Sequence, residues 1–81
     1  MIVFDDNKGY RNSIGYKELA KVYLEHYGSF AEKEFVVNMV LLLDTWENEK
    51  GLKFERIMPS DWNLLLKAVR VLNVDQPVFR P

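Results

Sequence analysis

The stretch FVVNMVLLLDTW, residues 35–46, decides the fold of this chain. Nine of its twelve residues are apolar, and at helical spacing they point in nearly every direction around the axis. A surface helix instead carries an apolar stripe about 100° wide. The valines would also suit a buried strand, which stays open as an alternative. The uninterrupted length and the flanking residues favour a helix that is apolar on most of its sides.

The flanking residues mark where this helix begins and ends. Ser29 and Glu32 have the spacing of a capping box, in which the serine oxygen accepts from one free amide and the glutamate reaches back to the serine amide. Gly51 can adopt the left-handed conformation that ends a helix. The sequence therefore predicts a helix from Phe30 to about Glu49.

Two shorter helices are expected on either side of it. Apolar residues recur at helical spacing over residues 15–27, and Gly28 can end that helix. Pro59 disfavours a helical conformation at the preceding residue, so the third helix should follow it, with Ser60 as its N-cap. Its apolar face predicts a helix over residues 60–72 that stops at Asn73.

The remaining segments are short. Residues 2–4 are β-prone and lead into a turn composition, whereas residues 10–13 are predicted as loop. Alternating polar and apolar residues around Phe54 indicate a short half-buried strand or an extended connection. Prolines after position 74 cannot donate to a strand ladder, which favours a peripheral tail.

Length and composition limit the fold class. The chain has 81 residues, of which 48% are apolar and 28% charged, enough for one compact domain and too apolar for a disordered segment. We expect a single domain over residues 1–81, mainly α, with three helices and one or two short peripheral strands. A strand and loop would occupy residues 1–13, and a C-terminal tail residues 74–81. An α+β fold with a small sheet is the alternative.

Patterns for catalysis and metal binding are weak. The single histidine, His26, falls in the last turn of the first helix, where the helix dipole favours a cation, and cysteine is absent. Ser29 and Ser60 are assigned to helix caps, and no glycine-flanked serine or phosphate-binding glycine loop occurs. Asp44 and Glu47 supply too few oxygens for a calcium site. The sequence therefore indicates a protein that is not an enzyme and uses no cofactor or metal.

Membrane and export patterns are also weak. The longest apolar run, residues 39–43, is far shorter than the roughly 20 residues of a spanning helix. The first residues lack the basic start and apolar run of a secretory signal. We therefore expect a cytoplasmic protein without a membrane partner.

Charge along the chain points to a partner. Residues 25–49 carry a net charge of −5, against +1 for residues 1–24 and +3 for residues 50–81. An apolar helix that its short neighbours cannot cover, bordered by acidic residues, is typical of an association surface. We expect a small protein-binding module, such as an inhibitor, an adaptor or a regulatory accessory factor. Its partner would be another protein, or a second copy in a homodimer formed through this helix.

The residues that we assign to partner binding lie on and around the second helix. They are Phe35, Met39, Leu42, Trp46, Glu32, Asp44 and Glu47. The alternative is that the other elements bury this helix completely within one chain. The binding hypothesis assumes a helix too apolar to face water along any side, so exposure along half of its circumference in a single chain would count against it.

A second hypothesis is a nucleic-acid-binding regulator. The helix over residues 60–72 would present basic side chains and an asparagine to the bases, while neighbouring basic residues contact phosphates. These residues are Lys50, Lys53, Arg56, Asn63, Lys67 and Arg70. The connection after the first helix also has the short, glycine-containing form of a helix-turn-helix. The acidic second helix and the net charge of −1 count against this hypothesis.

Overall fold

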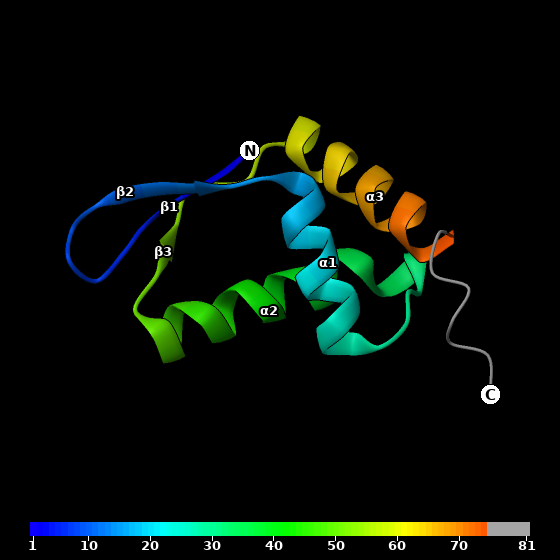
Figure 1. Ribbon diagram of the computed structural model, residues 1–81, viewed down its shortest axis with the longest axis horizontal. Helices are drawn as coiled ribbons and strands as arrows, with labels where there is room; N and C mark the ends of the chain where they lie inside the picture. Colours follow the sequence, from blue (N-terminus) through cyan, green and yellow to red (C-terminus); the bar gives the residue numbers. More distant parts are fainter. Residues whose placement is uncertain (75–81) are drawn as a thin grey trace.

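The computed structural model describes residues 1–74, which form three helices with a small three-stranded sheet at one end of the molecule (Figure 1). In chain order the elements are β1 (Ile2–Asp5), β2 (Arg11–Ile14), α1 (Tyr16–Tyr27), the single 3₁₀ turn η1 (Glu32–Glu34), α2 (Phe35–Lys50), β3 (Lys53–Phe54) and α3 (Pro59–Val74). The prediction of a mainly α fold with short strands is confirmed. Of the predicted tail, only Val74 lies within the described residues, and it ends α3.

The sheet has the order β2-β1-β3, and both pairings are antiparallel. Ile2 lies opposite Ile14, and Phe4 lies opposite Phe54. The prediction that residues 10–13 form a loop is wrong, because most of them belong to β2. This strand is mostly exposed and its polar residues do not alternate with apolar ones, so it lacks the period that identifies a half-buried strand.

The start of α2 differs from the prediction. Ala31 is extended, with φ −118° and ψ 112°. Ser29 and Glu32, the two residues of the expected capping box, are therefore not joined by helical backbone. Regular helix begins at Phe35, after η1, and no side chain caps either start. The predicted Ser29 cap is therefore wrong. The predicted end is confirmed, since Gly51 adopts φ 67° and its amide donates to the carbonyl of Glu47 at 3.1 Å.

The other two helices lie where they are expected. α1 ends at Gly28, which has φ 71°. α3 begins at Pro59, a residue well suited to a first helical position because it has no amide to leave unpaired. The prediction that Ser60 caps it is wrong, because Ser60 lies inside the helix. The carboxylate of Asp61 accepts the amide of Met58 at 3.2 Å, which is the N3 half of a capping box.

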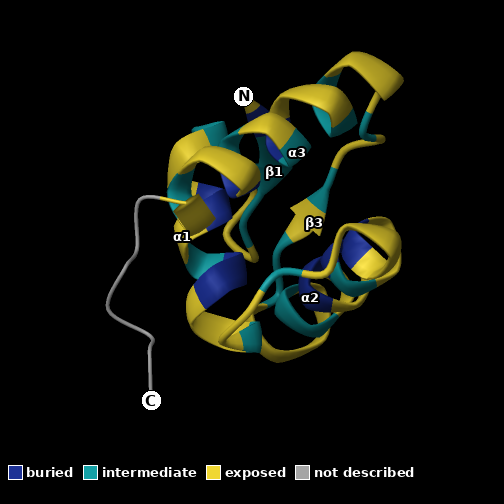
Figure 2. Cartoon of the chain, turned by 90° about the vertical axis from the view of Figure 1, so that its right-hand side faces the viewer, coloured by how far each residue is buried: buried dark blue, intermediate teal, exposed yellow. Residues whose placement is uncertain are grey.

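The core lies between the inner sides of the helices (Figure 2), and Ile2 of β1 contributes to it. Its fully buried large side chains are Leu19, Tyr23, Phe35, Met39, Leu42, Leu65 and Val69. Phe35 is central, since its ring lies 5.5 Å from that of Tyr23 on α1 and 6.1 Å from that of Trp62 on α3. Within residues 1–74, none of the helices has the length and hydropathy needed to cross a membrane.

Candidate protein-interaction surface

α2 has a buried side and an exposed side. The exposed side carries large aliphatic residues over its first two turns: Val36 is 51% exposed, Val37 62%, Val40 49% and Leu41 54%. We call these four residues the α2 face. The alternative in which the other elements bury this helix completely is therefore wrong. The premise that it is too apolar to face water along any side is also wrong, because one side of the helix is exposed and continues into Asp44, Glu47 and Asn48, which are polar. The binding hypothesis therefore loses its argument from the helix as a whole and depends on the exposed aliphatic residues alone.

Most of the apolar residues predicted to contact a partner lie on the buried side of α2, not on its exposed side. Phe35, Met39 and Leu42 are buried in the core and do not reach the surface. Trp46 is half-buried between α2 and β3, where its ring lies 6.1 Å from that of Phe54. Helical spacing groups these four residues correctly, but a helix that is apolar in most directions gives no indication of which side the core takes.

The predicted acidic contacts have different surroundings. Glu32 forms an ion pair with Arg70 of α3. Asp44 and Glu47 are exposed and form no ion pair with the rest of residues 1–74. They lie on the same side of α2 as the α2 face, one to two turns further along the helix. Two carboxylates without ion-pair partners among residues 1–74 therefore adjoin the α2 face.

A groove of about 250 Å³ borders the α2 face. Apolar side chains from α2, β3 and the start of α3 line it: Val40, Leu43, Phe54, Ile57 and Trp62. Asp44, Glu47 and Glu55 add carboxylates, of which Glu55 pairs with Arg11 at 2.5 Å. We call it the acidic groove. An aliphatic chain with a positive end, such as a lysine or arginine side chain, fits this combination.

A second apolar patch, which the sequence did not predict, lies on α3. Lys17, Leu64, Lys67, Ala68, Val71 and Leu72 line a shallow depression of about 280 Å³. Leu64 is 46% and Val71 52% exposed. We call these six residues the α3 stripe. Its charged residues are both lysines, so its charge is opposite in sign to that of the acidic groove.

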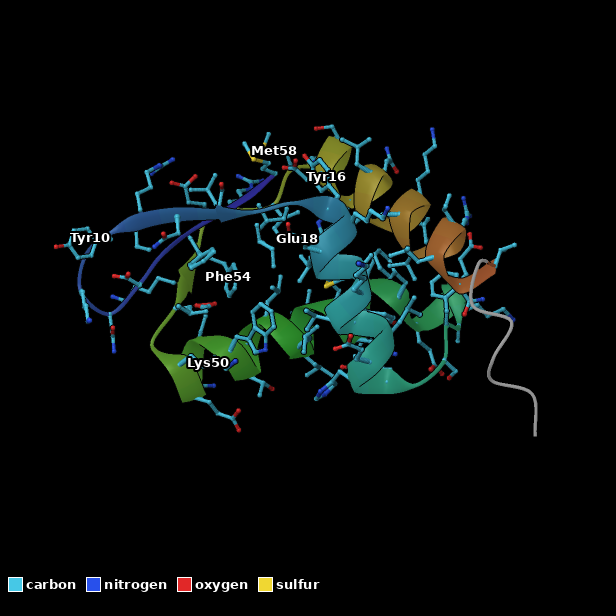
Figure 3. All side chains as sticks on the ribbon, viewed as in Figure 1. Tyr10, Tyr16, Glu18, Lys50, Phe54 and Met58 are labelled. Atoms are coloured by element: carbon cyan, nitrogen blue, oxygen red, sulfur yellow. The ribbon has the colours of Figure 1, made fainter. Side chains whose placement is uncertain are left out.

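The residues of the nucleic-acid hypothesis are spread over several elements. Lys50 ends α2, where its ammonium lies 5.3 Å from the centre of the Trp46 ring, and Figure 3 shows it far from α3. Lys53 belongs to β3, and Arg56 follows that strand. Asn63 and Lys67 are exposed on α3, while Arg70 is paired with Glu32. The fold does not gather these six residues into one basic surface.

The titratable groups with shifted pKa values hold helices together. The hydroxyl of Tyr16 donates to Asp61 at 2.5 Å and so joins the starts of α1 and α3 (Figure 3). This bond and the amide of Met58 lower the pKa of Asp61, while the same bond and then desolvation raise the pKa of Tyr16. Burial raises the pKa of Tyr27, whose hydroxyl donates to the carbonyl of Asn38 at 2.7 Å. Each of these groups serves a structural contact.

Chemistry-bearing clusters are sparse in the described part of the chain. His26 is exposed at the end of α1, with its ring edge-on to Tyr27. Residues 1–74 contain no group of three or more histidines or carboxylates that could hold a metal ion. No protein-family model, curated protein or solved structure matches the chain. Its function therefore has to be inferred from the chemistry of its own surfaces.

Proposed function

We propose that this protein is a non-enzymatic binding module whose docking surface is the α2 face together with the acidic groove. The observation that carries the proposal is the α2 face itself. Four neighbouring aliphatic side chains, each about half exposed, cover two consecutive turns of one helix. Contiguous apolar patches bordered by polar groups mark interaction sites on folded proteins, whereas isolated exposed aliphatic residues do not.

The chemistry of the surface defines its partner. Val40 belongs to both the α2 face and the acidic groove, so one ligand can cover the two together. Asp44 and Glu47 would attract lysine or arginine and would repel phosphate. The partner we propose is therefore a protein helix with aliphatic residues on one side and basic residues beside them, laid along α2.

The size of the surface sets the expected affinity. Standard interfaces use about 20–30 residues on each side, many more than the α2 face and the groove provide. Binding should therefore be reversible and suited to a regulatory, inhibitory or adaptor protein. The charged part of the interaction lies at an exposed rim, so it should weaken as salt is added.

Titration calorimetry with designed peptides tests the proposal. The probe is a helical peptide with leucines on one side and lysines on the other, and the control peptide has glutamate at every lysine position. We expect the lysine peptide to bind and the glutamate peptide not to bind. Replacing Val37 and Leu41 together by serine should weaken lysine-peptide binding at least tenfold, because it removes two of the four side chains of the α2 face.

A matched double variant controls for general loss of apolar surface. Leu64→Ser with Val71→Ser removes two aliphatic residues of similar exposure from the α3 stripe. It should not weaken binding of the lysine peptide. Equal weakening by both double variants, or no binding to the unaltered protein, would contradict the proposal.

A further inference from the structure

We infer that the ligand of the α2 face is a second copy of this chain, which docks through its α3 stripe. This inference rests on the proposed function and names the partner. One molecule carries both an acidic apolar surface and a basic apolar surface, and each has the composition that the other requires. The opposite charges and the shared apolar character of these two surfaces are the observation that points to a second copy as the ligand.

The α3 stripe has the form of the helix that the α2 face should bind. Leu64 and Val71 are two turns apart on α3, and Lys67 lies between them, so the aliphatic and basic groups share one side of the helix. Leu64 and Val71 are separated by about 10 Å along the axis, at 1.5 Å per residue. Val37 and Asp44 on α2 have the same separation in sequence. An exposed aliphatic residue and an exposed carboxylate of α2 therefore occur at the spacing of Leu64 and Val71 on α3.

The two surfaces lie on different parts of the molecule. α3 runs along the top and α2 along the bottom in both views (Figures 1 and 2). α1 contributes Lys17 to the α3 stripe, whereas α2, β3 and the start of α3 line the acidic groove. The residues of the two surfaces do not overlap, so a copy that uses one keeps the other free.

The contact is therefore head-to-tail rather than two-fold symmetric. A symmetric dimer through α2 would place two acidic grooves side by side, and residues 32–50 of each copy carry a net charge of −3, from five acidic and two basic residues. Docking α3 onto α2 instead brings opposite charges together. Because the two contacting surfaces differ, the interaction repeats and builds a chain or a closed ring of copies.

Mixing two single variants tests this arrangement. Val37→Glu disables the α2 face and Val71→Glu disables the α3 stripe, and both positions are more than half exposed, so the fold should survive. In sedimentation velocity the unaltered protein should associate as its concentration rises, and each variant alone should be monomeric. Their equimolar mixture should form a one-to-one dimer, because the Val71→Glu chain supplies an intact α2 face and the Val37→Glu chain an intact α3 stripe.

Tyr10→Glu is the matched control. Tyr10 is 67% exposed on the β1–β2 hairpin and belongs to neither surface, so this variant should associate like the unaltered protein (Figure 3). Circular dichroism on each variant verifies that the helices are retained. Higher salt should reduce association of the unaltered protein, since the charged groups lie at exposed rims.

The outcomes separate this inference from the proposed function. Self-association of the Val71→Glu variant alone, with no gain on mixing, would indicate a symmetric α2 contact and overturn the head-to-tail arrangement. An unaltered protein that stays monomeric at millimolar concentration but binds the lysine peptide on α2 would overturn this inference and leave the proposed function standing. Failure of both self-association and peptide binding would remove the two together.

Discussion

Two glycines show how single residues set the ends of helices. Gly28 and Gly51 follow α1 and α2 with positive φ values, a conformation that costs other residues about 1–2 kcal/mol. A Cβ atom on Gly28 would meet nothing within 4 Å, whereas one on Gly51 would lie 2.9 Å from the Cβ of Asn7. The Cβ of Asn7 is bonded directly to the backbone, so no side-chain rotation can move it out of contact.

We therefore predict that Gly51→Ala destabilises the fold more than Gly28→Ala does. Gly28→Ala should lower the free energy of unfolding by about 1 kcal/mol, the cost of the conformation alone. Gly51→Ala adds the displacement of the β1–β2 turn. Urea unfolding of both variants measures the difference, and equal losses would show that the contact with Asn7 has no energetic consequence.

The bond between Tyr16 and Asp61 gives a second prediction at this scale, one that depends on pH. The pKa of Asp61 is lowered below its ordinary value of 3.8 in the folded chain, so its contribution is present above pH 3.8 and is lost as pH falls through the folded pKa. The pKa of Tyr16 is raised above 10.0, so its contribution is present below pH 10.0 and is lost as pH rises through the folded pKa.

Tyr16→Phe should therefore reduce stability at neutral pH. Its deficit relative to the unaltered protein should shrink in acid, once Asp61 is protonated, and in strong alkali, once the unaltered Tyr16 ionises. Thermal unfolding of both proteins across this pH range provides the comparison. A deficit that is constant with pH would mean that the hydrogen bond does not link the two ionisations.

At the scale of elements, the buried side of α2 should contribute far more to stability than its exposed side. Leu42 is buried in the core, while its neighbour Leu41 is 54% exposed. Leu42→Ala should lower the free energy of unfolding by about 2–5 kcal/mol, and Leu41→Ala by about 0.5 kcal/mol or less. Chemical unfolding of the two variants tests this, and similar costs would mean that the exposed side of α2 is packed in solution.

Element positions could be predicted more reliably than their caps. The apolar spacing and the terminal glycines identify α1 and the end of α2 because these patterns are local. Ser29 and Ser60 have equally good local patterns but do not cap, since the chain is extended at Ala31 and Asp61 takes over the start of α3. β2 gave no periodic pattern because both of its faces are largely exposed.

At the scale of the whole molecule, the candidate surfaces could not be read from sequence. Glu47, Phe54 and Trp62 line one groove although they come from three elements, and only the packing of α2 beside β3 and α3 brings them together. Likewise, Lys17 joins the α3 stripe from α1. The sequence predicts an apolar, acidic association region on the second helix, but it does not indicate which side of that helix is exposed, because most of the helix circumference is apolar.

The location of a bound ligand tests the proposed docking surface most directly. Methyl and amide NMR spectra of the labelled protein should be followed during titration with the peptide that carries leucines and lysines. At a protein concentration below that of self-association, we predict that the largest shift changes occur at Val36, Val37, Val40 and Leu41, with smaller changes at Asp44 and Glu47 and none at Leu64 or Val71. Changes centred on α3, or spread evenly over the surface without a maximum on α2, would contradict a docking site on the exposed side of α2.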